Sequence, residues 1–347
     1  MNYVGVDLHK RTAWFYVIDH NGNKLLSKNL STNSDVLKHF LEELPKPFML
    51  AVETTYNWYF FVDLARLYAQ EVFLANSFEL KAFAKRHKKN DRIDARLIAG
   101  ILQKGFLPIV TIADQKTREF RELLRYRMKL IVDRSRIIFR LKALLDALGL
   151  KGEGDFTTYK KLREIQTDAL CESYKKITQG YGEQIEALNR RIFGLQKDLE
   201  SLCRQDPDVM RLTTIPGLGY FSAALVKTEI IDISRFKNFN RLCAYAGLAP
   251  RVSASANKTH HGPLSKNRRK HLQWILLEVA IHFIRALPNN KERFQMIQKR
   301  KGHNTAKVAL ARDMLKVIYH VLKEKRDFYW SSSPKIQSVA TTALSGV

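Results

Sequence analysis

Cysteine is scarce in this sequence, and long hydrophobic runs are missing. The 347 residues include three cysteines, Cys171, Cys203 and Cys243, which are widely spaced and form no Cys-x-x-Cys pair. This usage argues against structural zinc and is typical of a reducing cytoplasm. No stretch of about 18 consecutive apolar residues occurs, which argues against a transmembrane helix. The N-terminus passes directly into a strand-like pattern without a secretory leader. We therefore expect a cytoplasmic protein with no membrane partner.

Acidic residues are in the minority. The chain has 34 Asp and Glu residues against 59 Lys and Arg, a formal net charge of +25. So basic a protein favours a polyanionic partner such as nucleic acid. Charge alone leaves a ribosome-type binder or a membrane-surface protein as alternatives. The hydrophobic content of 45% is enough for proper cores, and the length allows two compact domains and a connector.

Four of these few carboxylates stand at informative positions. Asp7 and Glu53 each close a short apolar run that predicts a buried strand. Asp91 and Asp94 are three positions apart at the start of a helical pattern, so both project from one helix face. Carboxylate oxygens are the ligands that magnesium and manganese prefer. An acidic pocket in so basic a chain predicts a metal-dependent enzyme acting on nucleic acid.

The order of the predicted elements brings these carboxylates together. The dipeptide Asn21-Gly22 predicts a hairpin turn between the second and third strands. Three meandering strands followed by alternating helices and strands are the order of a ribonuclease-H-like fold, in which the first and fourth strands are neighbours. The predicted strands cover 2–7, 13–18, 24–30, 48–52 and 71–75, and the predicted helices cover 34–44, 57–70, about 77–87 and 91–104.

Each carboxylate taken alone also has a purely structural interpretation. Asp91 could cap its helix, Asp94 could pair with Arg92 or Arg96, and Glu53 could simply end a strand. All four at matching places in one fold favour the metal site.

The middle of the chain predicts two long helices. Residues 116–149 contain no proline or interior glycine, and their apolar residues recur every three or four positions beside a very basic face that includes Arg125 and Arg136. Residues 159–203 are again largely helical but should be interrupted at Gly180, Gly182 and Gly194. Such a pair suggests an antiparallel coiled-coil arm that spaces domains or joins subunits, and a plain helical connector is the alternative.

A second domain should begin near Asp206. The segment Ile215-Pro216-Gly217-Leu218-Gly219, before a helix at 220–229, is typical of the hairpin in helix-hairpin-helix modules. Gly217 and Gly219 would let backbone N–H groups approach a phosphate, although a plain turn is the alternative. The rest predicts helices at 238–247, 267–287 and 305–325, a loop at 249–266, a basic run at 299–301, and a disordered tail from Ser331.

Five segments are distinctive in combination: Gly5-Val6-Asp7, Glu53-Thr54, Asp91-Arg92-Ile93-Asp94-Ala95, Ile215-Pro216-Gly217-Leu218-Gly219 and Tyr245-Ala246-Gly247-Leu248-Ala249-Pro250-Arg251. Together they resemble the DEDD insertion-sequence transposases, the bridge-RNA-guided serine recombinases, which are also similar to Piv-type DNA invertases. The resemblance spans roughly residues 2–326. It implies a RuvC-like domain at 1–112, a helical coiled-coil arm at 113–204, a mostly α-helical C-terminal transposase domain at 205–330 and a disordered tail at 331–347. It further implies a recombinase that inserts and excises its own mobile element, guided by a structured non-coding RNA.

The resemblance also assigns residues to roles. It implies that Asp7, Glu53, Asp91 and Asp94 hold Mg²⁺ or Mn²⁺. The family's nucleophilic serine lies in the loop after the Gly-Leu-x-Pro turn, and counting from both ends of that loop places it at Ser255. The family usually has glycine at the next position, where this chain has Ala256, so Ser253 is a second candidate. The serine would attack phosphorus and leave a phosphoserine link to one DNA strand.

Basic residues would hold the nucleic acids. Arg251, Lys258 and Lys266 are near Ser255 in sequence and could bind the scissile phosphate, although a solvated role is the alternative for each. Exchange between two duplexes needs several active sites, so a homodimer or homotetramer is expected. The candidates for holding DNA or guide RNA elsewhere are Lys88, Lys89, Arg125 and Arg136.

Two other functions fit parts of the pattern. A RuvC-like junction nuclease would cut with metal-activated water and would need no serine. A nucleic-acid-binding architectural protein would need neither metal nor Asp7. Covalent attachment to DNA and dependence on metal separate the three functions.

Overall fold

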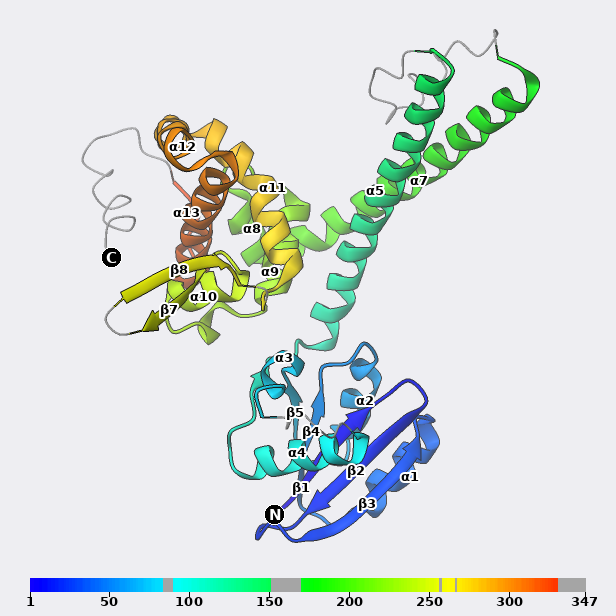
Figure 1. The fold of residues 1–347 in the computed structure, drawn as a ribbon, viewed down its shortest axis with the longest axis vertical. Helices are drawn as coiled ribbons and strands as arrows, with labels where there is room; N and C mark the ends of the chain where they lie inside the picture. The colour runs from blue at the N-terminus through cyan, green and yellow to red at the C-terminus, as the bar shows by residue number, and fades with distance from the viewer. Residues whose placement is uncertain (84–89, 151–169, 256–257, 266, 330–347) are drawn as a thin grey trace. The chain divides into compact units, whose positions relative to one another are not determined.

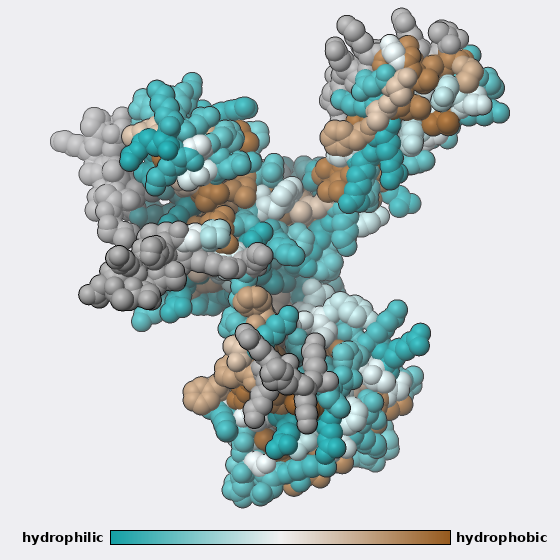
Figure 2. All heavy atoms as spheres, in the orientation of Figure 1, coloured by the Kyte–Doolittle hydropathy of each residue, from teal (hydrophilic) through white to brown (hydrophobic). Residues whose placement is uncertain are grey.

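The computed structural model describes residues 1–83, 90–150, 170–255, 258–265 and 267–329 (Figure 1). The chain forms two compact units, Met1–Ala113 and Asp114–Val347. Across the described ranges, no helix combines the length and apolar character needed to span a bilayer. The face drawn in Figure 2 is mainly hydrophilic, in keeping with a chain in which 27% of residues are charged.

The first unit is built on a six-stranded mixed sheet with the strand order β3-β2-β1-β4-β5-β6. Strand β1 pairs antiparallel with β2 and parallel with β4, so the expectation that the first and fourth strands are neighbours is confirmed. The hairpin between β2 and β3 turns at Gly22, whose φ is +86°, and the Asp19 carboxylate accepts the backbone N–H groups of Asn21 and Asn23. The strands are β1 (Asn2–Leu8), β2 (Thr12–Ile18), β3 (Lys24–Ser31), β4 (Phe48–Glu53), β5 (Glu71–Ala75) and β6 (Ile109–Val110).

Helices cover both faces of this sheet. On one face, side chains of β1, β2 and β4 form a buried core with α1 (Ser34–Glu43) and α2 (Trp58–Ala65). On the other face, α4 (Asp91–Gln103) packs against β1 and β2 through Ala95 and Ala99. A short helix, α3 (Ser77–Leu80), follows β5. Both faces of the central strands are therefore buried, which explains their nearly continuous apolar sequence.

The predicted helix 57–70 is too long. Helix α2 ends at Ala65, and the next residues form a turn in which Arg66 and Ala69 donate backbone hydrogen bonds to Val62 and Ala65. The chain must reverse here because β5 begins at Glu71. The start of β5 therefore ends the helix before the helical sequence pattern ends.

The second unit begins with two long antiparallel helices, α5 (Gln115–Ala147) and α7 (Glu172–Gln205). Near one end, Leu141 and Leu145 pack on Ile185, and near the other Leu124 belongs to the core that contains Leu199. The predicted interruptions of α7 at its three glycines are wrong, because the helix continues through all of them. Each glycine costs about 1 kcal/mol of helix propensity, which packing along α5 offsets.

The remaining helices share one core with the adjoining parts of α5 and α7. Two segments differ from expectation. The segment 249–266, predicted as a loop, includes an antiparallel hairpin, β7 (Pro250–Ser255) and β8 (Lys258–Leu264), whose strands are paired by cross-strand backbone hydrogen bonds. Apolar and polar residues alternate in β7, whereas β8 has no such alternation. The basic run at 299–301 ends an unpredicted helix, α12 (Pro288–Lys301). The other elements are α8 (Pro207–Thr213), α9 (Tyr220–Ile230), η1 (Ile233–Arg235), α10 (Phe239–Ala246), α11 (Lys270–Ala286) and α13 (His303–Glu324). The predicted tail from Ser331 lies outside the described residues.

Candidate functional site

Strand β1 and helix α4 approach each other closely at Gly5. A Cβ atom built on Gly5 would lie 2.1 Å from the carbonyl oxygen of Ala95 and 2.4 Å from the backbone nitrogen of Ala99. Real Cβ atoms do not make such contacts, so only glycine fits this position. The close packing sets the first turn of α4 beside the end of β1, where Asp7 lies.

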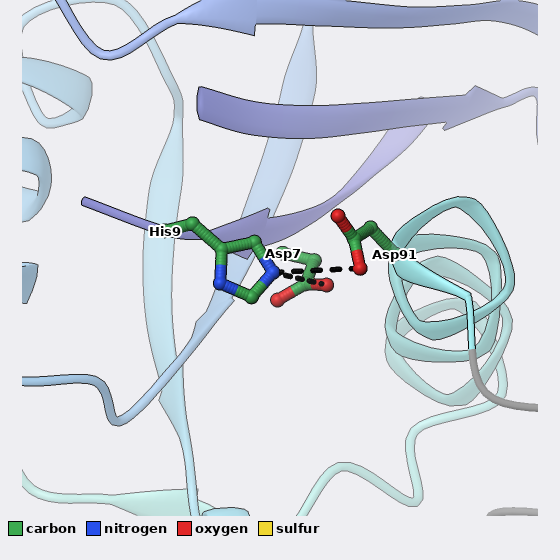
Figure 3. A group of neighbouring side chains, drawn as sticks. All are labelled: Asp7, His9 and Asp91. Atoms are coloured by element: carbon green, nitrogen blue, oxygen red, sulfur yellow. Dashed lines mark hydrogen bonds and ion pairs between the residues drawn. The ribbon is translucent and has the colours of Figure 1, made fainter. Parts of the chain in front are cut away.

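The carboxylates of Asp7 and Asp91 meet at one imidazole (Figure 3). The Nε2 atom of His9 lies 3.2 Å from Oδ2 of Asp7 and 3.6 Å from Oδ1 of Asp91. Asp7 is almost fully buried at the end of β1, whereas Asp91 is half-exposed on the first turn of α4. Asn90, rather than Asp91, caps α4, because its side chain accepts the N–H of Arg92. The Asp91 carboxylate therefore has no capping role to explain its position.

Glu53 and Asp94 lie near this group but outside the set of ligand atoms within 4.8 Å of one another, which comes from Asp7, His9 and Asp91. Glu53 is the last residue of β4, the strand that pairs with β1. The pKa of Asp7 is raised to about 6, mainly by burial and further by repulsion from Asp91, Asp94 and Glu53, although His9 lowers it. The structure thus brings Asp7 and Asp91 together at one end of β1, with Glu53 and Asp94 close enough to repel the Asp7 carboxylate. Their role as metal ligands stays a prediction.

His9 is the member of this group that sequence reasoning missed. The pattern Asp7-Leu8-His9 contained the signal, because alternate residues of an extended segment point to the same side. The predicted strand 2–7 ends at Asp7, and no role was predicted for His9. His9 sits just past β1, where its backbone N–H donates to Thr12 O at 2.8 Å.

The residues at this site fit a divalent metal ion. The carboxylate oxygens suit magnesium or manganese, and the one imidazole nitrogen is a ligand more typical of transition ions such as manganese. The carboxylates repel one another around the buried Asp7, and a cation between them would offset that repulsion. Chemically, such a group can bind a cation next to a phosphate and stabilise negative charge on it.

The predicted nucleophile lies on the β7–β8 hairpin. Ser255 is the last residue of β7, and its cross-strand partner is Lys258, the first residue of β8. Ser253, the second candidate, is two positions earlier and pairs with His260. Arg251 lies in β7 beside Pro250. Ala256 and Lys266, and the predicted nucleic-acid ligands Lys88 and Lys89, lie outside the described residues.

A buried carboxylate lies near the base of this hairpin. The side chain of Glu229 in α9 is 1% exposed, and its oxygens lie 2.7 Å from Arg125 Nη2 and 3.3 Å from Arg269 Nε. Burial alone would raise the pKa of Glu229, but Arg269, Arg125 and Arg121 lower it below its usual value. Tyr245, four residues before Ala249, donates its hydroxyl hydrogen to the carbonyl of Glu229 at 3.1 Å. The cluster therefore ties α5 and α9 to the segments on both sides of the hairpin.

The other predicted nucleic-acid ligands occupy different surroundings. Arg125 is mostly buried in the Glu229 cluster, whereas Arg136 is 67% exposed and pairs with Asp133 at 2.9 Å. Gly217 has a φ of +93° and packs against α11, where a Cβ would lie 3.1 Å from Phe283 N. Gly219 has open space around its α-carbon. A side chain would therefore be obstructed at Gly217 but not at Gly219.

Family comparisons cover both units. Residues 4–149 match a family model described as a transposase, and residues 209–295 match one described as the transposase IS116/IS110/IS902 family. The first range contains the four acidic residues around Asp7, and the second contains Ser253 and Ser255.

Individual relatives agree with these matches. The chain is 26% identical to the transposase for insertion sequence element IS1111A of Coxiella burnetii, over 72% of this chain and 70% of the relative. It is also 26% identical to the transposase for insertion sequence element IS1328 of Yersinia enterocolitica, over 82% and 84%. A shorter similarity, 32% identity over 34% and 37%, joins it to the pilin gene-inverting protein of Moraxella bovis.

Proposed function

The chain belongs to the IS116/IS110/IS902 family of transposases, and we propose that it cuts and rejoins DNA at its own insertion sequence through a metal-assisted phosphoserine intermediate, guided by a structured RNA. The observation that supports this most is the gathering of Asp7, Glu53, Asp91 and Asp94 at one end of β1. As a transposase, the protein binds DNA.

The fold of the first unit supports the proposed chemistry. Three antiparallel strands followed by parallel β4 and β5 give the strand order expected of a ribonuclease-H-like, specifically RuvC-like, domain. In this proposal the four acidic residues hold Mg²⁺ or Mn²⁺. The bound ion would neutralise charge that develops on the scissile phosphate.

Ser255 provides the proposed nucleophile. Its hydroxyl oxygen attacks phosphorus, an Oγ–P bond forms, and the bond from phosphorus to the 3′-oxygen breaks. The serine proton is lost to the surroundings, and the departing oxygen takes up a proton to become a free 3′-hydroxyl. Reversal by the 3′-hydroxyl of a different strand rejoins DNA and releases the serine, so no external energy source is needed. Ser253 is the second candidate for the same role.

Basic residues provide the proposed nucleic-acid contacts. Contacts to phosphates hold nucleic acid without reading its sequence. Target choice would then rest on base pairing with the guide RNA, while the protein contacts mainly backbone and shape. Strand exchange between two duplexes requires several copies of the chain, as a homodimer or homotetramer. The candidate residues are Arg251, Lys258, Lys266, Lys88, Lys89, Arg125, Arg136 and Gly219, with Gly217 supporting the turn.

The proposal is tested by recombination in vitro. The full-length protein is incubated with Mg²⁺, a plasmid carrying the element ends, and RNA transcribed from the flanking region, and joined and cleaved products are quantified. Asp7→Asn and Glu53→Gln should lower strand cleavage by about 10²- to 10³-fold, because they remove groups that stabilise transition-state charge. Glu43→Gln, on the exposed side of α1, is the matched control and should leave activity unchanged.

Two results would overturn parts of the proposal. Full activity of Asp7→Asn would rule out the proposed metal site. Cleavage that never produces rejoined strands, with or without RNA, would instead support a metal-dependent junction nuclease.

A further inference from the structure

We propose that His9 is a direct ligand of the bound metal ion, so that the centre combines an imidazole nitrogen with carboxylate oxygens. This inference rests on the proposed metal site at Asp7. It concerns a residue that lies between the acidic groups and has no assigned role.

The spacing of the donor atoms supports a shared ion. One ligand atom from each of Asp7, His9 and Asp91 lies within 4.8 Å of the other two. The Nε2 atom of His9 is 3.2 Å from the Asp7 carboxylate and 3.6 Å from the Asp91 carboxylate. In an octahedral site with bonds of about 2.1 Å, neighbouring ligands are about 3 Å apart and opposite ligands about 4 Å. Both contacts of His9 fall within this span.

Two hydrogen bonds hold the backbone of His9 in place. The N–H of His9 donates to Thr12 O at 2.8 Å, and its carbonyl accepts a hydrogen bond from Asn57 Nδ2 at 3.0 Å. These bonds fix the residue from two sides just after β1 ends. In Figure 3 the ring turns its Nε2 edge toward both carboxylates. The nitrogen is therefore available at the position where the acidic ligands converge.

A simple ion pair is the competing explanation. A histidine between two carboxylates can act as their counter-cation, and metal binding would then displace it. The two explanations differ in one observable, which is whether nitrogen is bonded to the metal after the ion has bound.

Imidazole ligation also affects metal preference. Carboxylate and water ligands suit Mg²⁺, whereas imidazole favours the transition ions over it. Loss of His9 should therefore weaken Mn²⁺ binding by about tenfold or more, the scale on which metal sites respond to loss of supporting groups. Mg²⁺ affinity should fall less, by at most about threefold, because this ion gains less from nitrogen.

The experiment uses the full-length protein and Mn²⁺ alone. Electron paramagnetic resonance titration gives the affinity, and pulsed measurements of electron spin echo modulation detect ¹⁴N bonded to Mn²⁺. Wild type and His9→Gln are compared with His39→Gln, a matched control whose imidazole is 74% exposed on α1. Incorporation of ¹⁵N-labelled histidine should convert the ¹⁴N signal to the ¹⁵N pattern.

We expect a nitrogen coupling in wild type and His39→Gln that His9→Gln lacks. Mn²⁺ that binds in an Asp7-dependent manner but shows no nitrogen coupling would overturn the inference while leaving the metal site intact. Failure of wild type to bind Mn²⁺, or unchanged binding by Asp7→Asn, would instead overturn the proposed metal site itself. The two failures are therefore distinguishable.

Discussion

Glu229 and Arg269 form an ion pair of 3.3 Å in which the carboxylate is 1% exposed. Glu229 lies in α9, and Arg269 immediately precedes α11, the helix that follows the β7–β8 hairpin. The backbone N–H of Arg269 also donates to Tyr245 O at 3.1 Å. The pair therefore joins the core of the second unit to the chain that leaves the hairpin carrying Ser255.

Glu229→Gln should destabilise the second unit. The substitution keeps the shape but removes the negative charge among Arg121, Arg125 and Arg269, and breaking a buried pair costs about 3–5 kcal/mol. The matched control is Glu122→Gln, whose half-exposed carboxylate pairs with Arg125 at 3.0 Å and should cost less than about 1 kcal/mol. Urea unfolding followed by circular dichroism measures both. Equal losses in the free energy of unfolding would show that the buried ion pair stabilises the protein no more than the exposed one.

Gly5→Ala should separate α4 from β1. The new methyl group would overlap the backbone of Ala95 and Ala99, so the helix must move and Asp91 and Asp94 must move with it. We expect a loss of about 1–3 kcal/mol in the free energy of unfolding, or more, together with a large loss of metal affinity.

Gly100→Ala is the control for that substitution. Gly100 lies in the same helix with open space around its α-carbon, so alanine should stabilise the protein by about 0.5–1 kcal/mol. Calorimetric metal titration and thermal unfolding of both variants test the pair. Normal metal binding by Gly5→Ala would contradict the role given to the close packing.

Asp7→Asn should stabilise the metal-free protein near neutral pH. Burial and the neighbouring carboxylates raise the pKa of Asp7 from 3.8 to about 6, so keeping it ionised in the folded state costs free energy. The contribution of protonated Asp7 to the free energy of unfolding is fully present below pH 3.8. It is lost as the pH rises through about 6, which lowers the free energy of unfolding by about 3 kcal/mol. The asparagine variant avoids this cost, so it should be more stable than wild type at pH 7.5 and nearly equal at pH 4.

Denaturant unfolding in EDTA at the two pH values measures this difference. Added Mg²⁺ should stabilise wild type but not Asp7→Asn, which would reverse their order. An asparagine variant that is less stable than wild type in EDTA at pH 7.5 would show that burial and the neighbouring carboxylates do not destabilise ionised Asp7.

Local patterns predicted most of the first unit. The apolar runs that end at Asp7 and Glu53 predicted strands, and the Asn21-Gly22 turn predicted the hairpin that orders the sheet. The need for Gly5 was not predictable, because its reason lies in a helix that begins 86 positions later, at Asp91. His9 was missed because the predicted strand ends at Asp7, whereas β1 continues to Leu8 and its alternation places His9 on the side of Asp7.

Two features of the second unit were not predicted, namely the β7–β8 hairpin and the continuity of helix α7. The β7–β8 hairpin was predicted as a loop although apolar and polar residues alternate in β7, because β8 lacks such alternation and contains Gly262 and Pro263. Helix α7 continues through Gly180, Gly182 and Gly194 because packing along α5 outweighs their low helix propensity. The continuity of α7 depends on packing against α5, which a local sequence pattern does not contain.

The most direct test of the proposed mechanism is covalent capture of protein on DNA. Full-length protein is incubated with element-end DNA, the flanking RNA and Mg²⁺, quenched in denaturant, and separated on a gel beside Ser255→Ala, Ser253→Ala and Asp7→Asn. The account predicts a protein-linked DNA band that survives Ser253→Ala and disappears in Ser255→Ala and Asp7→Asn. Loss of the band in Ser253→Ala alone would identify Ser253, instead of Ser255, as the nucleophile. Cleaved DNA with no linked protein, unchanged in both serine variants, would contradict the account.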